Sequence, residues 1–334
     1  MNVEFLEALE EIAREEGIER EELYKIVAKG LEVAYRIEHE TAKEIRVEID
    51  RNSGEIKIIA DGEEAELNIR DFGRIAARRA EETIRQEIIR RRREIIYERY
   101  APKVGELISG AVHRFEGGRV WLNLGRAEAL LAEEERIPGE RYRPGEQLRA
   151  YLFRVEKTQG DPRILVSRAH PKFVERLLEL EVPELGQGLV KVEAIAREPG
   201  VRTKLAVSSA SPEIDPVGTC IGPNGIRVRA VVRELGGEKV EVIRWSEDVR
   251  ELIKSCLEPA RVLEIEIDEG ERKARVVVPD DELSLAIGKG GHNTRLTAQL
   301  TGYAIEVTSP KELQAKTETE TETETERAAN ADRV

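Results

Sequence analysis

The spacing of apolar residues predicts a helical start to the chain. Apolar residues recur every three or four positions within residues 3–16 and again within 21–37, as they do on one face of a helix. An alternating stretch with an Asn-Ser-Gly turn at 52–54 predicts a hairpin. A long charged helix is expected over residues 72–100. Its run of four arginines is typical of a solvated, salt-bridged helix face, with a phosphate-binding patch as the alternative.

Between residues 104 and 170 the pattern changes to short alternating runs separated by glycine turns. The runs that indicate strands are ELISGAVHRF, GRVWLNLGRAEALL, EQLRAYLFRV and RILVSRAH. So many short strands in so few residues favour a small closed barrel. Barrels of the OB type bind single-stranded nucleic acid with aromatic and basic side chains. The candidates here are His113, Phe115, Trp121 and Arg168. An inward-facing Trp121 with a purely structural role is an open alternative.

From residue 171 onward the chain repeats one pattern of elements. Each copy predicts the order helix, strand, strand, helix, helix, strand, and we call the copies the first repeat (171–245) and the second repeat (246–310). The matching core segments are GTCIGPNGIRVRAVVRELGG and LAIGKGGHNTRLTAQLTG, each with Ile-Gly-x-x-Gly between its two helices. The predicted fold class is therefore an α+β multidomain protein with a helical and hairpin N-terminal domain, an OB-type barrel and two αββααβ units.

A Gly-x-x-Gly turn between two helices suits a phosphate backbone. Glycines lack a Cβ, so a sugar-phosphate chain can lie against the turn, and the next helix offers free N–H groups. This is the chemistry of the KH module, which holds four nucleotides of single-stranded RNA. The alternative is that the glycines only cap helices or allow close packing. The candidate RNA-binding residues are Gly222, Pro223, Asn224, Gly225, Arg227 and Arg229 in the first repeat, and Gly288, Lys289, Gly290, Gly291, His292, Asn293 and Arg295 in the second.

Composition narrows the function classes. The net charge is −13 over 334 residues, but acid gathers in the first helices and in the Thr-Glu repeat near the C-terminus, and basic clusters lie between them. That tail, assigned to 311–334, should be disordered because it lacks apolar residues. Two cysteines make no disulfide framework. No apolar run is long enough for a membrane helix. Because the two cysteines form no disulfide framework, a reducing cytoplasm is the expected location.

No enzyme site emerges from the residues. The four histidines lack the spacing of metal ligands, and the Lys289 loop does not match a phosphate-binding Walker motif. The acidic pairs at 247–248 and 280–281 precede predicted helices, where capping explains them. We therefore expect no catalytic residues, no cofactor and no metal.

The two Gly-x-x-Gly segments, the barrel segment YRPGEQLRAYLFRV and the opening MNVEFLEALEEIAREEGI together resemble the NusA family of bacterial transcription factors. The resemblance spans residues 1–315. It implies a polymerase-binding N-terminal domain at 1–102, a barrel of the ribosomal S-one type at 103–170, and KH domains in the two repeats. It further implies a protein that docks on the RNA polymerase core, holds nascent single-stranded RNA, and modulates pausing, intrinsic termination and antitermination. NusB, NusE and NusG are the further partners implied, and a monomer is expected.

Two other functions are compatible with the residues. A barrel followed by KH units also resembles the RNA-binding end of polynucleotide phosphorylase, but too few residues precede the barrel here for its phosphorolytic domains. The second alternative is a ribosome- or mRNA-associated RNA-binding protein, or an accessory of RNA degradation, that does not act through polymerase. The first hundred residues would distinguish these functions by the partner they bind.

Overall fold

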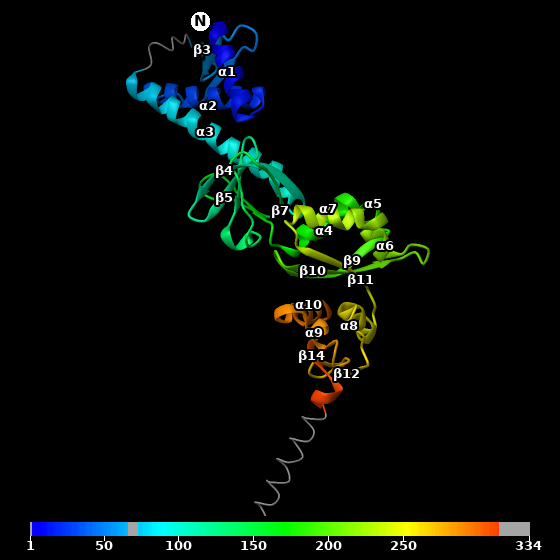
Figure 1. Ribbon diagram of the computed structural model, residues 1–334. Helices are drawn as coiled ribbons and strands as arrows, with labels where there is room; N and C mark the ends of the chain where they lie inside the picture. The colour runs from blue at the N-terminus through cyan, green and yellow to red at the C-terminus, as the bar shows by residue number, and fades with distance from the viewer. Residues whose placement is uncertain (1, 66–72, 314–334) are drawn as a thin grey trace, which may run out of the picture. The chain divides into compact units, whose positions relative to one another are not determined.

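The computed structural model describes residues 2–65 and 73–313 (Figure 1). The predicted tail lies outside this part from residue 314 onward, as does Phe72 at the expected start of the long helix. The described chain forms two compact units. Of the described residues, one unit comprises 2–65, 73–104, 110–130 and 152–166, and the other comprises 105–109, 131–151 and 167–313. We describe each unit by itself.

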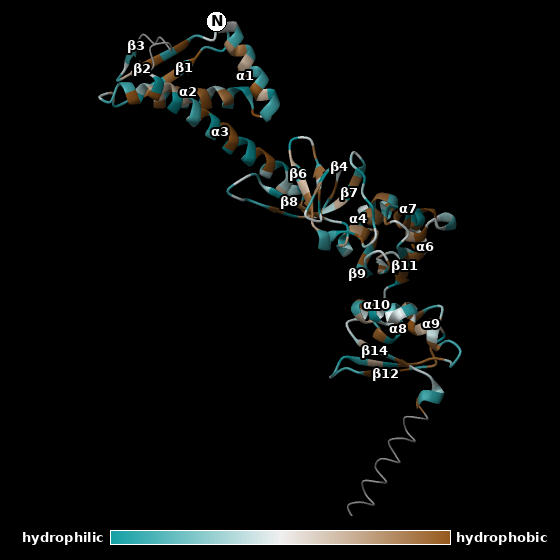
Figure 2. Cartoon of the chain, turned by 60° about the vertical axis from the view of Figure 1, so that its left-hand side comes forward, coloured by the Kyte–Doolittle hydropathy of each residue, from teal (hydrophilic) through white to brown (hydrophobic). Residues whose placement is uncertain are grey.

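The N-terminal part combines three helices with a small sheet, as the apolar spacing predicts. Its sheet is antiparallel, in the order β1-β2-β3. The third strand was not foreseen from the sequence. Figure 2 shows apolar residues along α2 and along β1 and β2, which share one core with α1 and α3. The elements are α1 (Asn2–Glu16), α2 (Arg20–Glu38), β1 (Ile45–Ile49), β2 (Ile56–Ala60), β3 (Glu63–Ala65) and α3 (Arg74–Tyr100).

Helices α2 and α3 approach closely because small residues line their contact. Ala34, Ala76 and Ala80 form a buried cluster between them. Gly30 faces Ile84, and a Cβ added there would overlap the Ile84 side chain. The small residues therefore fix how the long helix lies on the N-terminal core.

The arginine run on α3 is engaged with carboxylates. Arg90 pairs with Glu87 and Glu94, and Arg91 pairs with Glu22, which holds the pKa of Arg91 above its usual value. The next two arginines both lie within 3.3 Å of Asp161. The salt-bridged interpretation of this run is confirmed.

The middle segment forms a closed five-stranded barrel in the order β4-β5-β6-β8-β7. One predicted strand, GRVWLNLGRAEALL, is in fact two strands that are separated by a turn. Gly125 adopts φ 96° there, and its N–H donates to the Asn123 side chain over 2.7 Å. The strands are β4 (Leu107–Glu116), β5 (Arg119–Asn123), β6 (Glu128–Leu131), β7 (Gln147–Glu156) and β8 (Arg163–Ser167), with short 3-10 turns η2 (Ala101–Lys103) and η3 (Glu133–Glu135).

Each repeat folds as helices over a three-stranded sheet. In both sheets the central strand pairs antiparallel with the preceding strand and parallel with the last one. The first repeat contains α4 (Pro171–Glu181), α5 (Pro183–Gly186), β9 (Val190–Glu198), β10 (Arg202–Ser209), α6 (Pro216–Ile221), α7 (Ile226–Glu234) and β11 (Lys239–Arg244). The second contains α8 (Val249–Leu257), β12 (Glu264–Asp268), β13 (Lys273–Val277), α9 (Leu283–Ile287), α10 (His292–Thr301) and β14 (Ala304–Thr308). The predicted fold class is confirmed.

The two repeats pack together through the sheet of the first. Its own helices cover one face, and α8 and α10 of the second repeat cover the other (Figure 1). Ala206 and Ile243 meet Leu296 and Leu300 there in a buried apolar cluster. Lys204, 1% exposed, crosses this interface and donates to the Cys256 backbone oxygen over 2.6 Å. The repeats are therefore one packed pair.

Candidate nucleic-acid interface

The two Gly-x-x-Gly turns adopt the same backbone conformation. The first glycines, Gly222 and Gly288, have φ and ψ of 73° and 170° and of 75° and 166°. The last glycines, Gly225 and Gly291, have 72° and 23° and 73° and 15°. These left-handed values favour glycine because a Cβ would crowd the backbone. We call the turns the first loop (222–225) and the second loop (288–291).

The third position of each loop is also left-handed. Asn224 has φ 50° and Gly290 has φ 60°. Asparagine tolerates this region better than most side chains do. The sequence analysis missed this requirement, although Asn in one loop facing Gly in the other was a usable signal for it.

Both loops present their middle residues to solvent. Pro223, Asn224, Lys289 and Gly290 are exposed. Helices α7 and α10 begin directly after the loops. Their first N–H groups, those of Ile226 and His292, donate to the Pro223 and Lys289 backbone oxygens, and no side chain caps either helix start. Uncapped N–H groups at a helix start, together with the positive end of the helix dipole, attract phosphate. Each loop can therefore receive an anionic backbone.

The second residue after each loop packs under its first glycine. A Cβ added at Gly222 would lie 2.7 Å from the Arg227 Cγ, and one at Gly288 would lie 2.9 Å from the Asn293 Cβ. Arg227 donates to the Thr219 backbone oxygen over 2.8 Å. Asn293 is 4% exposed and donates to a backbone oxygen of α9 over 2.9 Å.

Arg227 and Asn293 therefore support the loop conformation from the protein side of each loop. Arg227 is half-buried, and its charge is matched by Glu184 at 3.1 Å. We therefore correct the sequence prediction for Asn293, because its burial prevents direct contact with RNA. We also expect a smaller contribution of Arg227 to RNA binding, because its charge is already paired.

The arginines at the next matched position differ in their surroundings. Arg229 is exposed, and no ion pair to it occurs in the described chain. Arg295 donates to the Gly290 oxygen over 3.0 Å and lies 3.5 Å from Glu198 of the first repeat. His292 Nδ1 lies 2.5 Å from the same carboxylate, and this contact lowers the pKa of Glu198. His292 and Arg295 therefore join the second loop to the first repeat.

Lys289 is the one charged residue within the two loops. It is exposed, and none of the described acidic residues pairs with it. It can therefore bind a phosphate without first breaking an ion pair within the chain.

On the barrel, Trp121 faces outward. Its strand neighbours Val120 and Leu122 are fully buried inside, so the alternating side chains place the indole on the outer surface. A bulge at His113 opposes Arg114 to Trp121 across the β4–β5 pair, and the Arg114 guanidinium lies 4.5 Å from the indole centroid. The structural alternative for Trp121 is therefore not supported.

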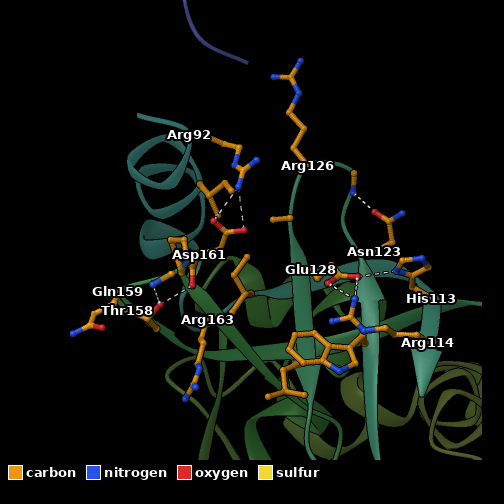
Figure 3. Close-up of a pocket in the computed structure, with 18 residues that line it drawn as sticks. Arg92, His113, Arg114, Asn123, Arg126, Glu128, Thr158, Gln159, Asp161 and Arg163 are labelled. Atoms are coloured by element: carbon orange, nitrogen blue, oxygen red, sulfur yellow. Dashed lines mark hydrogen bonds and ion pairs between the residues drawn. The ribbon is translucent and has the colours of Figure 1, made fainter. Parts of the chain in front are cut away.

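The other barrel candidates lie in different surroundings. Phe115 is 49% exposed on β4. His113 is exposed, and its Nδ1 lies 2.7 Å from Glu128 (Figure 3).

Arg168 does not belong to this surface. It is 2% exposed and donates to Glu140 and to Glu234, as well as to two backbone oxygens. The prediction of Arg168 as an RNA contact is wrong, because a guanidinium satisfied inside this network cannot reach a ligand. Both acidic partners are distant in sequence, which hid the network from the sequence analysis.

Residues 2–65 and 73–313 contain neither a membrane-spanning helix nor a candidate metal site. No helix there is long and apolar enough to cross a membrane. No group of three or more His, Cys, Asp or Glu side chains there could hold a metal ion.

Comparison with known proteins gives consistent matches along the chain. Family models match as the NusA N-terminal domain at residues 4–63, the NusA-like first KH domain at 168–245 and the NusA-like second KH domain at 249–315. Three similar curated proteins are each named transcription termination/antitermination protein NusA. The Halalkalibacterium halodurans protein is 38% identical over 94% of this chain and 90% of its own length. The Bacillus subtilis protein is 36% identical over 95% and 96%, and the Thermus thermophilus protein is 40% identical over 91% and 89%.

Proposed function

Because this chain belongs to the NusA family, we propose that it docks on the core of bacterial RNA polymerase and holds emerging single-stranded RNA. In this way it modulates pausing, intrinsic termination and antitermination. One observation carries the proposal: the same exposed loop conformation occurs twice, and each loop is followed by a helix whose start no side chain caps.

RNA is held by backbone and cations rather than by a deep cleft. Phosphates lie against the two loops, where Lys289 and Arg229 add charge that no carboxylate of the described chain neutralises. Because the repeats are one packed pair, a strand that occupies one loop raises the effective concentration of its next nucleotides at the other. Two weak contacts thereby act as one stronger contact.

Attachment to polymerase explains how a chain with net charge −13 can act on RNA. Its overall charge opposes free association with a polyanion. Tethering supplies a high local concentration of transcript, so modest loop affinity suffices. We assign the tether to the N-terminal domain at residues 1–102 and the RNA contacts to the barrel and the repeats. NusB, NusE and NusG, a cytoplasmic location and a monomeric state complete the proposal.

A binding experiment with the full chain tests the attachment. The immobilised protein is incubated with purified RNA polymerase core and, separately, with ribosomal subunits, both at low and at high salt. We expect retention of the polymerase core that resists salt better than any ribosomal signal does. Retention of ribosomal subunits alone would replace this function with the ribosome-associated one.

A further inference from the structure

One short segment of the first repeat contacts its own core, the chain between β6 and β7, and the second repeat. It comprises residues 197–200, at the end of β9 and the start of the turn that leads to β10, and we call it the junction segment. All of these contacts lie within one compact unit. The sequence analysis assigned no role to any residue of this segment.

Arg197 anchors the junction segment in the first repeat. Its guanidinium forms two hydrogen bonds of 2.9 Å with the Glu238 carboxylate, and both side chains are fully buried. A third bond, also of 2.9 Å, goes to the His170 backbone oxygen. Glu238 accepts in addition the Gly200 N–H over 2.8 Å. A buried pair of this kind restricts the backbone of the segment, because moving either group would leave a charge buried without its partner.

Gly200 lies directly against the chain between β6 and β7. It has φ 77°, and a Cβ added there would lie 3.2 Å from the Ile137 Cγ2 and 3.2 Å from the Pro138 backbone oxygen. Ile137 is itself buried in the core of the first repeat. The junction segment is therefore enclosed on this side as well, and its backbone has little freedom to move.

Glu198 extends from this anchored backbone to the second repeat. Its carboxylate lies 2.5 Å from His292 Nδ1 and 3.5 Å from the Arg295 guanidinium. An ionised carboxylate only accepts, so the Nδ1 proton of the imidazole donates to it. His292 begins α10 directly after the second loop, and Arg295 donates to the Gly290 oxygen within that loop. One carboxylate thus holds two side chains that are attached to the second loop.

The apolar contacts between the repeats lie further along the same helix. Leu296 and Leu300 pack against the sheet of the first repeat about one and two turns after His292. They hold the body of α10, whereas the Glu198 contacts hold its first turn, which carries the loop.

We propose that Glu198 is a positioning residue, which orients the second loop relative to the first so that one RNA strand can occupy both. The proposal rests on the RNA-holding function of the loops and gives Glu198 no contact with RNA. Loss of the carboxylate then has two effects of opposite sign. It releases the second loop and lowers the effective concentration that one loop provides for the other. It also removes negative charge beside Arg295 and raises the affinity of the second loop for phosphate.

The full chain with Glu198→Gln separates the two effects. Its affinity for a labelled adenylate hexadecamer is measured by fluorescence anisotropy in two backgrounds, the native loops and a first-loop variant with Pro223→Asp and Asn224→Asp. With native loops, Glu198→Gln should weaken binding by about 5-fold, because the loops no longer act as one contact. In the first-loop variant the same change should strengthen binding by about 2-fold, because Arg295 is released to the RNA. Circular dichroism verifies that each chain is folded.

Glu269→Gln is the matched control. Glu269 is an exposed carboxylate of the second repeat that forms no ion pair within the described ranges. Its replacement removes the same charge, so it reports general electrostatics and should act equally in both backgrounds. A change of sign between the backgrounds that occurs for Glu198→Gln and not for Glu269→Gln supports the positioning role.

Any other pattern overturns the inference. Stronger binding in both backgrounds would mean that the carboxylate acts through its charge alone. Weaker binding in both would mean that it supports the second loop itself rather than the position of that loop, and no change in either would leave it without a role in RNA binding. In these cases the proposed function stands, provided that the first-loop change itself weakens binding. If the first-loop variant binds the hexadecamer as tightly as the native chain does, the proposed function of the paired loops fails instead.

Discussion

The two repeats share their loops but differ in their sheets. The dihedral angles at the first, third and fourth loop positions agree within 10°, although only the glycines are common to both loops. The outer sheet face of the first repeat carries Ala206 and Ile243 and is covered by the second repeat. The same face of the second repeat carries exposed Lys273 and Arg275. A repeated backbone turn therefore requires only a glycine pattern, whereas the sheet face decides whether another unit stacks on it.

The loops also differ in how their charge is held. In the second repeat Arg295 pairs with Glu198, and in the first repeat Arg227 pairs with Glu184. Lys289 and Arg229 form no ion pair with any residue that the structure describes. At its loop, each repeat thus offers one cation without an ion pair to the described residues, at a different position. The comparison predicts that the loops contribute similarly to affinity although their sequences differ.

Replacing both loop centres with aspartate is expected to have the largest effect. The changes Pro223→Asp, Asn224→Asp, Lys289→Asp and Gly290→Asp add negative charge at both phosphate sites. Aspartate tolerates the left-handed third position, so the fold should persist. RNA affinity should fall by about 100-fold or more, since several phosphate contacts are lost together. Fluorescence anisotropy with a labelled single strand measures this, and circular dichroism checks the fold. Changing one loop at a time should lower RNA affinity by similar, smaller factors. If only one of the two loop variants lost affinity, the prediction that the loops contribute similarly would be wrong.

The sheet difference predicts unequal costs for two matched substitutions. Lys204 and Arg275 occupy the same face of the central strand, but Lys204 is buried under the second repeat. Lys204→Ala should destabilise the chain by about 2 kcal/mol because it leaves the Cys256 oxygen without its donor and opens a cavity. Arg275→Ala should change stability by less than about 0.5 kcal/mol. Denaturant unfolding measures the change in stability for both variants. It is followed by the fluorescence of Trp245, which packs at this interface, in a chain that also carries Trp121→Phe. Equal costs would mean that the second repeat does not cover the sheet in solution.

How far the sequence predicts this molecule depends on the range of the interaction concerned. The loops could be predicted because positive φ at Gly222 and Gly288 is a local property of the chain. The burial of Arg168 could not, because its partner Glu234 is 66 residues away. The placement of Arg114 opposite Trp121 depends on a bulge in β4, which no residue type signals. Local backbone conformation could therefore be predicted from the sequence, whereas hydrogen bonds and ion pairs between residues distant in sequence could not.

Single cation substitutions sharpen the comparison of the loops. Lys289→Gln should weaken RNA binding by about 5-fold and reduce the salt dependence by roughly one phosphate contact. Lys239→Gln, which removes an exposed lysine outside the loops, is the control and should change little. Arg229→Gln should weaken binding more than Arg295→Gln, because Glu198 already engages Arg295. Salt titrations of all four variants measure this, and the reverse order for the arginines would show that the ion pair does not restrain Arg295.

The smallest expected effect concerns the contact of Glu198 with His292. The pKa of Glu198 is below its usual value, mainly because of its hydrogen bond with His292 and also because Arg295 is near. A lowered pKa in the folded state means that the contribution to stability is complete above the unfolded-state pKa, and that it is lost as the pH falls through the folded-state value. Glu198→Gln should therefore cost up to about 1 kcal/mol at neutral pH, a size typical of partly exposed pairs.

The cost of Glu198→Gln should shrink towards zero in acid, since the wild-type carboxylate is then protonated as well. Unfolding free energies of both chains across the acid range measure this, with Glu269→Gln as the control, because the Glu269 carboxylate is exposed and unpaired in the described chain. A cost that is independent of pH would show that the side chain acts through packing. In that case the second loop would be joined to the first repeat by its apolar interface alone, and the two repeats would differ in their sheets but not in how their loops are held.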